Sequence, residues 1–284
     1  GLQFPTRLNL PGRTLELGAS PLIMGIVNVT PDSFSDGGEH FGVRQAVEHA
    51  RRLDHEGADW LDIGGESTRP GATPVPLEEE LRRVIPVIQA LSGKTDKTIS
   101  IDTYKPEVAR QAIEAGAEVI NDVTGFRDPA MIELAAQTDV ACVVMHMRGT
   151  PADMMEQTNY TDVVADLVDY FEQRIDDLIA AGVERQRIII DPGIGFAKRR
   201  ADNLRLIHRI DELAVLGRPI LLGASRKRII GEITERSEDG RLYGTLATSV
   251  WGYLRGVHLL RVHDVGPTRD ALAMTRAIDN EGRK

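Results

Sequence analysis

Cysteine is almost absent from this 284-residue chain, and the one cysteine, Cys142, lies inside the apolar run 140–145. A single cysteine excludes a disulfide framework and any cysteine-rich zinc module, and it fits a cytosolic setting best. Basic residues are in the minority, because 34 Lys and Arg against 43 Asp and Glu give a net charge of −9. A broad electrostatic grip on nucleic acid or on anionic lipid is therefore not expected.

Long apolar runs and several well-known catalytic motifs are missing as well. No stretch approaches the roughly 18 to 20 apolar residues of a membrane span, and the amino terminus lacks a basic region followed by an apolar core, so neither insertion nor export is expected. The chain has no HExxH, no GxxxxGK[ST] and no GxSxG around Ser225, and 193–196 is too short for a dinucleotide fingerprint. These absences disfavour a dedicated zinc site, phosphate-loop chemistry, a serine triad and NAD binding.

The chain has no internal segment that marks a domain boundary. Its 27 glycines and 14 prolines are spread along the sequence, without a low-complexity linker. We therefore predict a single domain over residues 1–284. Residues alternate on both sides of Pro11-Gly12, which predicts a β-hairpin within 2–17, as an extension covering residues 1–20.

Eight short apolar runs recur along the rest of the chain, and most are followed by a polar cluster and a longer amphipathic segment. The runs cover 22–27, 59–63, 98–101, 117–120, 140–145, 187–190, 219–222 and 257–262. Because the runs are nearly continuous in apolar character, the strands would be buried on both faces. This pattern favours an α/β fold, a (β/α)₈ TIM barrel with an N-terminal β-hairpin, over an open doubly wound sheet.

A weak internal regularity supports the barrel. Gly57, Gly116 and Gly256 each end a helical pattern, as C-terminal glycine caps do, and a polar residue follows each of them five positions later. The carboxyl ends of parallel barrel strands converge on one mouth, so polar residues at those ends would share a site. They are Asn28, Asp62 with Glu66, Asp102, Asn121 with Asp122, His146, Asp191, Lys227, and Arg261 with His263.

The types of side chain in this set suggest two kinds of ligand group. Asp102, Asn121 and Asp191 could accept hydrogen bonds from a flat heterocycle that presents an amino group and ring N–H donors. The cationic side chains suit an anion. Phosphate oxygens could be held by Lys227, Arg261, His263 and Arg69, and Asn28 could place a Mg²⁺ ion that keeps most of its waters.

Less specific interpretations remain open for several of these residues. An isolated Asp or Asn at a strand end often only caps a helix, and Asp62 and Asp122 are interpreted mainly as structural groups or as groups that support the residues in contact with a ligand. His146 lies between two methionines and is interpreted as a packed histidine. Lys227 lies between two arginines, which fits an anion clamp and a Schiff-base lysine equally well.

Two loops have an unusual composition. The segments 28–38 and 64–71 are long for connections between a strand and a helix, and they are dense in Gly, Pro and hydroxyl side chains. Such a composition is typical of a mobile lid, and closing both loops over the mouth would exclude water from a reactive centre.

These residues resemble one family over nearly the whole chain, from 24 to 265: the dihydropteroate synthases of folate biosynthesis. The most specific motifs are MGIVNVTPDSFSDGG at 24–38 and DIGGESTRPG at 62–71. Further matches are SIDT at 100–103, IND at 120–122, MHM at 145–147, DPG at 191–193, SRK at 225–227 and RVHDV at 261–265.

The resemblance implies a transferase in which p-aminobenzoate displaces diphosphate from (7,8-dihydropterin-6-yl)methyl diphosphate, giving 7,8-dihydropteroate. It also implies a TIM barrel, a Mg²⁺ cofactor, small-molecule substrates, a site that sulfonamides would also occupy, and a cytoplasmic homodimer joined away from the mouth. Neither nucleic acid nor a membrane is an expected partner.

Family roles carry over to matching positions. The implied pterin pocket consists of Asp102, Asn121, Met145, Asp191, Phe196 and Lys227. The implied diphosphate contacts are Asn28, Thr68, Arg69, Arg261 and His263, with Asn28 as the metal ligand. The implied p-aminobenzoate site and lid loops contain Thr30, Pro31, Asp32, Phe34, Ser35, Thr68, Arg69, Pro70, Phe196, Ser225 and Lys227. The implied catalytic residues are Lys227, Arg261, His263 and Asp102.

The chain departs from the family pattern at two positions. Arg228 stands where many members have Ser, which leaves sulfonamide sensitivity open, and Ala197 stands where Gly is frequent. Two alternatives were weighed against the synthase. A methyltetrahydrofolate:corrinoid methyltransferase would have no use for the motifs that suit a diphosphate. A catalytically silent paralogue would be expected to have lost Asn28, Arg69, Lys227 or His263, and all four are intact.

Overall fold

The apolar runs of the sequence form eight short parallel strands. The computed structural model describes residues 6–18, 20–29 and 38–283. The strands of the main sheet are β3 (Leu22–Asn28), β4 (Trp60–Gly64), β5 (Thr98–Asp102), β6 (Val119–Asp122), β7 (Ala141–Met145), β8 (Ile188–Asp191), β9 (Leu221–Leu222) and β10 (Leu259–Val262). The helices are α2 (Gly38–Glu56), α3 (Leu77–Leu91), α4 (Pro106–Ala115), α5 (Pro129–Ala136), α6 (Val163–Ala180), α7 (Arg200–His208), α8 (Arg228–Thr234), α9 (Leu242–Leu254) and α10 (Val265–Glu281).

The eight strands close into a barrel. Their order is β8-β7-β6-β5-β4-β3-β10-β9, and the two outer strands meet at a parallel bridge between Ile190 and Ile220. The backbone N–H of Ile190 also donates to the carbonyl of Pro219 at 2.9 Å. The predicted barrel is therefore confirmed, and the open sheet is wrong. Strand β9 is shorter than the predicted run 219–222 because proline has no N–H and the N–H of Ile220 donates to the ring of His258 instead.

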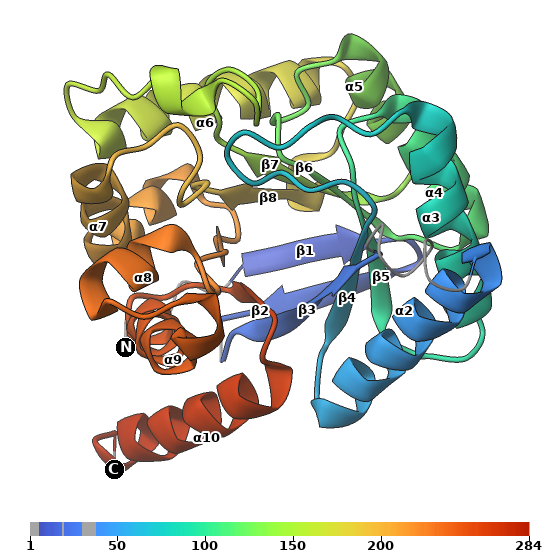
Figure 1. Cartoon of the computed structure of the whole chain (residues 1–284). Coiled ribbons are helices and arrows are strands. Elements are labelled where there is room, and N and C mark those ends of the chain that lie inside the picture. Colours follow the sequence, from blue (N-terminus) through green and yellow to red (C-terminus); the bar gives the residue numbers. More distant parts are fainter. Residues whose placement is uncertain (1–5, 19, 30–37, 284) are drawn as a thin grey trace.

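The helices surround the barrel (Figure 1). Their buried apolar side chains join those of the strands in one core cluster. In α3 the buried side chains Val84, Val87, Ile88 and Leu91 recur at the spacing of one helix face. Three glutamates in its first turn favour the start of this helix, where the dipole is positive. None of the helices in the described ranges is both long and apolar enough to cross a membrane.

Side chains alternate along each strand between the helix-covered outside and the barrel interior. On β4, Leu61 and Ile63 belong to the core under the helices, whereas Trp60 belongs to a second cluster inside the barrel. Because the period of a strand is two, Asp62 points to the interior as Trp60 does. The interior therefore changes from apolar at the amino ends of the strands to polar at their carboxyl ends.

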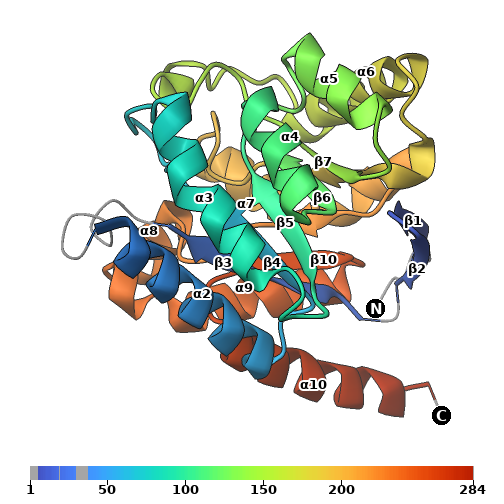
Figure 2. The ribbon, with the colours of Figure 1, turned by 90° about the vertical axis from the view of Figure 1, so that its right-hand side faces the viewer.

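The predicted hairpin lies under the amino ends of the barrel strands. Its strands β1 (Thr6–Leu10) and β2 (Arg13–Leu17) turn at 11–12 and pair in antiparallel register. Leu8, Leu10 and Leu17 pack in the interior cluster with the first residues of five barrel strands. Figure 2 shows the hairpin at the end of the barrel away from the first turns of α2 and α3. It closes one end of the barrel and leaves the other end for a site.

Arginine side chains fasten this hairpin to the barrel. Arg218 is buried and donates to the carbonyl oxygens of Ile188 and Arg7 at 3.0 Å each. Arg13 donates to Thr98 Oγ1 at 2.7 Å and also pairs with Glu118.

The three glycines that end helical patterns adopt the conformation expected of C-terminal caps. The φ angles are 111° at Gly57, 127° at Gly116 and 85° at Gly256, all in a region that side chains rarely adopt.

Truncation of the hairpin's central leucine should destabilise the fold. Leu8 is fully buried, so Leu8→Ala should lower the free energy of unfolding by about 2 to 5 kcal/mol through lost burial and a residual cavity. Urea denaturation followed by circular dichroism measures the change. Glu16→Ala removes an exposed side chain of the same hairpin and should stay within about 0.5 kcal/mol of wild type. Equal effects of the two variants would contradict the role of the hairpin in closing this end of the barrel.

Candidate active site at the carboxyl ends of the strands

The strand register brings the predicted polar residues to one mouth. Asn28 is opposite Gly64, which is opposite Asp102, and Asp102 is in turn opposite Asn121. Met145 is opposite Asp191 on the far side. Residues chosen from separate parts of the sequence therefore lie next to one another around one rim.

The first part of the site is a buried cluster around Arg261. Its Nε donates to Asp62 Oδ2 at 2.7 Å and its Nη2 donates to Asp102 Oδ2 at 3.3 Å. The same Asp62 oxygen accepts a hydrogen bond from Asn121 Nδ2 at 3.0 Å. Burial raises the pKa of Asp102, the negative charge of Asp62 raises it further, and the cation of Arg261 opposes both. Asp62, interpreted from sequence as a structural group or as a support for the ligand contacts, thus contacts two of the predicted site residues.

The second part of the site is formed by the segments that follow β8 and β9. Asp191 Oδ1 accepts a hydrogen bond from the backbone N–H of Gly193 at 2.8 Å. Lys227 Nζ donates to the carbonyl of Ile194 at 2.6 Å and lies 4.8 Å from the centre of the Phe196 ring. Burial lowers the pKa of Lys227 to about 8, against the opposing attraction of Asp191.

The arginines next to Lys227 do not join it. Arg226 is bound to both carboxylate oxygens of Asp264, at 3.1 and 2.7 Å. Arg228 pairs at 3.0 Å with Glu232 one turn further along α8. Of the three cations in this run, Lys227 is the one directed to the carbonyl of Ile194 and the ring of Phe196, while each arginine pairs with a carboxylate. The interpretation of the run as an anion clamp stays a prediction.

A buried lysine that the sequence analysis missed fixes the segment after β8. Lys198 Nζ donates to the carbonyls of Gly193 and Phe196 at 2.9 and 2.7 Å, and it lies 2.9 Å from His146 Nδ1. Burial holds its pKa well below the ordinary lysine value. Nothing in the local sequence separates this residue from an ordinary surface lysine. His146 is packed and buried, as predicted.

The backbone at the position before Lys198 explains why glycine suits this position, where the chain departs from the family pattern. Ala197 is buried and has φ of 53°, in the left-handed region that glycine adopts without strain. An alanine here therefore carries a strain that the frequent glycine avoids.

His263 directly follows β10, and two of its nitrogens contact the same oxygen of Ser225. Its backbone N–H donates to Ser225 Oγ at 3.1 Å, and its ring Nδ1 lies 2.8 Å from the same oxygen. Burial and then the charges of Arg226 and Arg261 lower the pKa of His263 to about 4. In the absence of a ligand His263 is therefore neutral near pH 7, and it would meet an anion first as an N–H donor, in contrast to the cation assumed from the sequence.

The loop after β4 reaches across the mouth. In Figure 1 this loop, drawn in teal between β4 and α3, extends toward α6 before it returns. The N–H of Gly71 donates to the carbonyl of Pro151 at 2.7 Å. Arg69 pairs through both terminal nitrogens with Glu238 in η4 (Glu238–Gly240), at 2.5 and 3.2 Å. The structure thus places Arg69 on a carboxylate at the rim, and Thr68 and Pro70 flank it.

Most of the first lid loop, residues 30–37, lies outside the residues that the structure describes. Thr30, Pro31, Asp32, Phe34 and Ser35, which the family resemblance places near p-aminobenzoate, lie outside the described residues.

Asn28, the predicted metal ligand, ends β3 at the mouth, and its side chain is exposed. Among the described residues no group of three or more His, Cys, Asp or Glu side chains is arranged to hold a metal ion. One amide oxygen nevertheless fits Mg²⁺, because this ion commonly keeps several waters and takes phosphate oxygens as further ligands.

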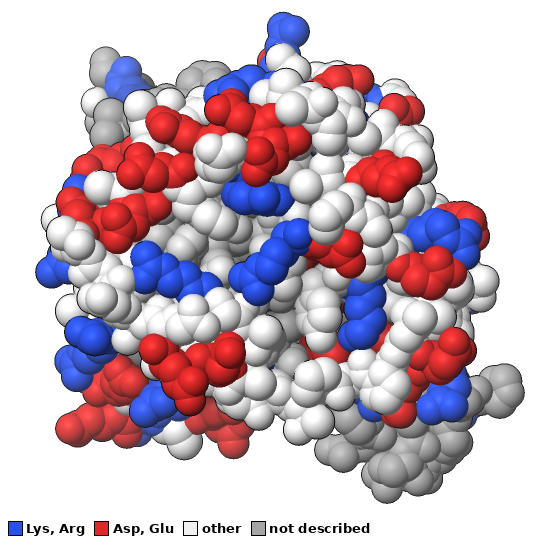
Figure 3. All heavy atoms as spheres, turned by 90° about the horizontal axis from the view of Figure 1, so that it is seen from above, with Lys and Arg blue, Asp and Glu red and all other residues white. Residues whose placement is uncertain are grey.

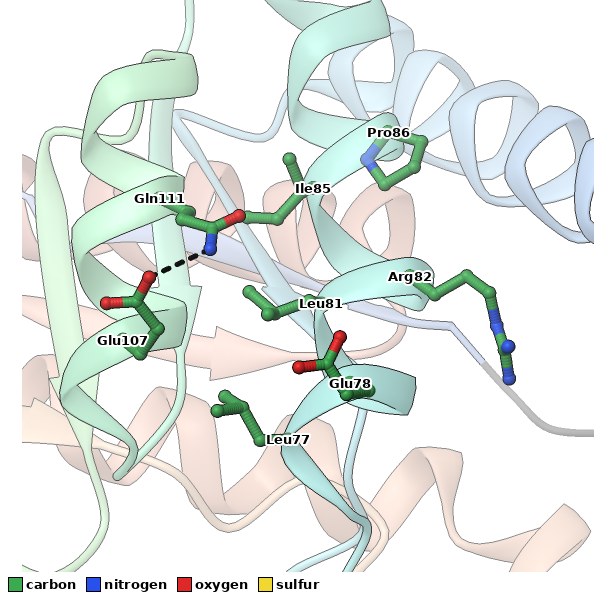
Figure 4. Close-up of a pocket in the computed structure, with 8 residues that line it drawn as sticks. All are labelled: Leu77, Glu78, Leu81, Arg82, Ile85, Pro86, Glu107 and Gln111. Atoms are coloured by element: carbon green, nitrogen blue, oxygen red, sulfur yellow. Dashed lines mark hydrogen bonds between the residues drawn. The ribbon is translucent and has the colours of Figure 1, made fainter.

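A separate groove of about 530 Å³ lies outside the barrel, between α3 and α4 (Figure 4). Its walls are Leu77, Leu81 and Ile85, and Glu107 at its edge already accepts a hydrogen bond from Gln111 at 2.9 Å. Figure 4 shows no gathering of polar side chains toward the centre of this groove. The mouth of the barrel is therefore the stronger candidate for the site.

Known proteins resemble this chain over nearly its whole length. Residues 24–263 match the family described as pterin binding enzyme. The dihydropteroate synthase of Escherichia coli (strain K12) is 43% identical over 271 residues, which are 95% of this chain and 96% of that protein.

Solved structures are similar over the whole fold. The Xanthomonas albilineans dihydropteroate synthase with 4-aminobenzoic acid is 50% identical, with a TM-score of 0.90 over 97% of this chain and 98% of that one. The Burkholderia cenocepacia dihydropteroate synthase complexed with 7,8-dihydropteroate is 41% identical, with a TM-score of 0.89 over 98% of each chain. The protein therefore belongs to the pterin binding enzyme family, among its dihydropteroate synthases.

Proposed function

We propose that this protein joins p-aminobenzoate to (7,8-dihydropterin-6-yl)methyl diphosphate, releasing diphosphate and giving 7,8-dihydropteroate. The observation that carries the proposal is the meeting of acceptors and cations at one mouth. Asp102 and Asn121 are opposite one another in register, and Arg261 donates to Asp102. The charges of Asp191 and Arg261 both act on Lys227. The relatives named above support the same reaction.

The pterin ring would be recognised by acceptors that have no second protein partner. Asn121 Oδ1 is buried and has no hydrogen-bond partner among the described residues. Asp191 uses Oδ1 for the loop N–H of Gly193, which leaves Oδ2 for the amino group and ring N–H of a pterin. Lys227 would donate to a ring acceptor, and Met145 and Phe196 would contact the ring faces.

The diphosphate would bind where the cations and N–H donors converge. Arg261 and His263 would contact its oxygens, and Arg69 with Thr68 would approach from the loop above once Arg69 leaves Glu238. We assign Mg²⁺ to Asn28 and to the oxygens of the substrate. When bound, the ion would offset the negative charge that grows on the departing diphosphate.

No protein nucleophile takes part in this reaction. The amine nitrogen of p-aminobenzoate forms a bond to the exocyclic CH₂ of the pterin, the bond from that carbon to the diphosphate oxygen breaks, and the amine loses a proton. The reduced pterin can delocalise positive charge at this carbon, so departure can run ahead of attack. The protein then has to orient both partners and to exclude water from the cation.

The p-aminobenzoate pocket would lie between the two lid loops and the segments after β8 and β9. Ser225, Lys227 and Phe196 would form its inner wall, and Thr68, Arg69 and Pro70 its cover. Ser225 is buried and already positions His263, which supports a place next to the leaving group.

We also assign a homodimer to this chain. The side chains Tyr243, Ala247, Trp251 and Leu254 are exposed and recur at the spacing of one face of α9. Such an apolar stripe fits a second copy of the chain better than solvent. Figure 3 shows a different face, the molecule seen from above Figure 1, on which acidic and basic side chains are interspersed and form no single basic surface. We also propose that residues 1–284 form a single domain. The free, buried Cys142 supports a cytoplasmic location.

Product formation tests the reaction directly. Wild type should convert p-aminobenzoate and the dihydropterin-methyl diphosphate to dihydropteroate and diphosphate with a requirement for Mg²⁺, measured by chromatography of the product. Lys227→Ala should lower kcat/KM by at least roughly a hundredfold, because it removes both a donor and a charge from the pocket. A folded wild type that binds the pterin diphosphate without turnover would favour the silent paralogue, and methyl transfer from a folate would favour the methyltransferase.

The charge of Lys227 should appear in the pH profile. Because burial lowers its pKa to about 8, the protonated form is lost as pH rises through about 8. The kcat/KM of wild type, which reports groups of the free enzyme, should therefore fall above pH 8. Lys227→Arg keeps its charge to far higher pH, so its lower activity should lack this descending limb. An unchanged limb in the arginine variant would assign the titration to another group.

A charge on the α9 stripe should break the dimer. Tyr243 is 82% exposed in the isolated chain, so Tyr243→Glu should leave the fold intact and shift the species seen in sedimentation velocity from dimer to monomer. Ile179→Glu places the same charge at an exposed apolar site on α6 and should remain a dimer. A monomeric wild type would refute this part of the proposal.

A further inference from the structure

Asp62 occupies a central place in the polar layer of the barrel without belonging to the proposed ligand contacts. It lies in the middle of β4, its side chain is fully buried, and it points into the interior below the mouth. A buried carboxylate is costly unless it is paired and hydrogen-bonded, so its partners define its role.

The partner on one side is Asn121. An ionised carboxylate can only accept hydrogen bonds, whereas an amide carries a donor end and an acceptor end. Asp62 Oδ2, 3.0 Å from Asn121 Nδ2, therefore admits only the NH₂ end of the amide. The opposite end, Asn121 Oδ1, is left buried and unpartnered among the described residues. If the Asn121 amide were rotated by half a turn, its Oδ1 would meet Asp62 Oδ2, and two acceptors would face each other. Its NH₂ group would then point toward the pterin, which also presents donors.

The partner on the other side is Arg261. The same Asp62 Oδ2 accepts from Arg261 Nε at 2.7 Å, while Asp102 takes Nη2. The guanidinium is planar, so fixing Nε and Nη2 fixes the direction of its remaining donors. One oxygen atom thus orients a proposed pterin acceptor and a proposed diphosphate donor.

We propose that Asp62 is a positioning residue. Through one shared oxygen it fixes the orientation of the Asn121 amide and of the Arg261 guanidinium, and so couples binding of the pterin to binding of the diphosphate. This inference rests on the proposed function. It assigns Asp62 no contact with a substrate; its effect passes through Asn121 and Arg261. A purely structural role would instead be limited to neutralising Arg261 in the core.

A double-mutant cycle separates positioning from mere structural support. Asp62→Asn removes the charge with little change of shape, and calorimetry with 6-hydroxymethyl-7,8-dihydropterin should show roughly tenfold weaker binding than wild type. In an Asn121→Ala background the same change should weaken binding by less than about twofold, because the amide that Asp62 orients is gone. Equal losses in both backgrounds, or no loss in either, would overturn the proposal.

Pyrophosphate with Mg²⁺ serves as the second probe. Asp62→Asn should weaken its binding several-fold through Arg261, whereas Asn121→Ala should leave it unchanged. Ser100→Ala is the matched control, because Ser100 is opposite Asp62 in register, is buried, and has a hydroxyl with no hydrogen-bond partner among the described residues. This control should bind both probes as wild type does, and equal losses in Ser100→Ala and Asp62→Asn would also overturn the proposal.

A measurement on wild type covers the case in which Asp62→Asn does not fold or in which the chain binds no pterin. In ¹⁵N-labelled protein the Asn121 side-chain amide should exchange its hydrogens far more slowly than a free amide, since Asp62 holds it. Exchange at the free rate would overturn the positioning role. Failure of wild type to bind a pterin would instead refute the proposed function, and the exchange rate would still decide the role of Asp62.

Discussion

The pairing of Arg261 with two buried carboxylates is the interaction on which the polar half of the barrel depends. Asp62 and Asp102 lie close enough for one guanidinium to bind both, and without that cation two buried negative charges would be strongly unfavourable. Even with it, the pKa of Asp102 is raised. The same guanidinium is the proposed contact of the diphosphate. A bound anion would therefore compete with the two aspartates for one cation, and the two halves of the site cannot be independent.

The barrel interior separates stability from chemistry along its axis. Leucines of the hairpin and the first residues of five strands form an apolar cluster at one end, and the buried Arg218 beside it donates to two backbone carbonyls. At the other end, two residues further along the same strands, the interior positions carry Asp62, Asn121, Asp191 and Arg261. Substitutions at the hairpin end act on folding, whereas substitutions at the mouth act on ligands. Because the hairpin closes the amino end of the barrel with leucines, the interior can be apolar at that end and polar at the mouth.

Most of the fold could be predicted from the sequence, because its signals are local. Apolar runs, glycine caps and the turn at 11–12 each depend on a few adjacent residues, and the convergence of strand ends follows from the barrel itself. The partners of the site residues could not be predicted. Whether Asn121 meets Asp62, or Arg69 meets Glu238, depends on register and on side-chain rotamers across strands that are far apart in sequence. Lys198 was missed for the same reason, since only its burial distinguishes it from a surface lysine.

A reaction without a protein nucleophile depends on orientation, and the site is built accordingly. The proposed ligand groups are each held by a second protein group: Asn121 by Asp62, Asp191 by the N–H of Gly193, Lys227 by the carbonyl of Ile194, and His263 by Ser225. Each is fixed by one hydrogen bond and keeps a further donor or acceptor for the ligand. Groups held in this way need little reorganisation when charge moves from the pterin carbon to the diphosphate, and that reorganisation is the cost that a preorganised site avoids. The protein partners of the ligand groups are therefore as much a part of the catalytic arrangement as the groups themselves.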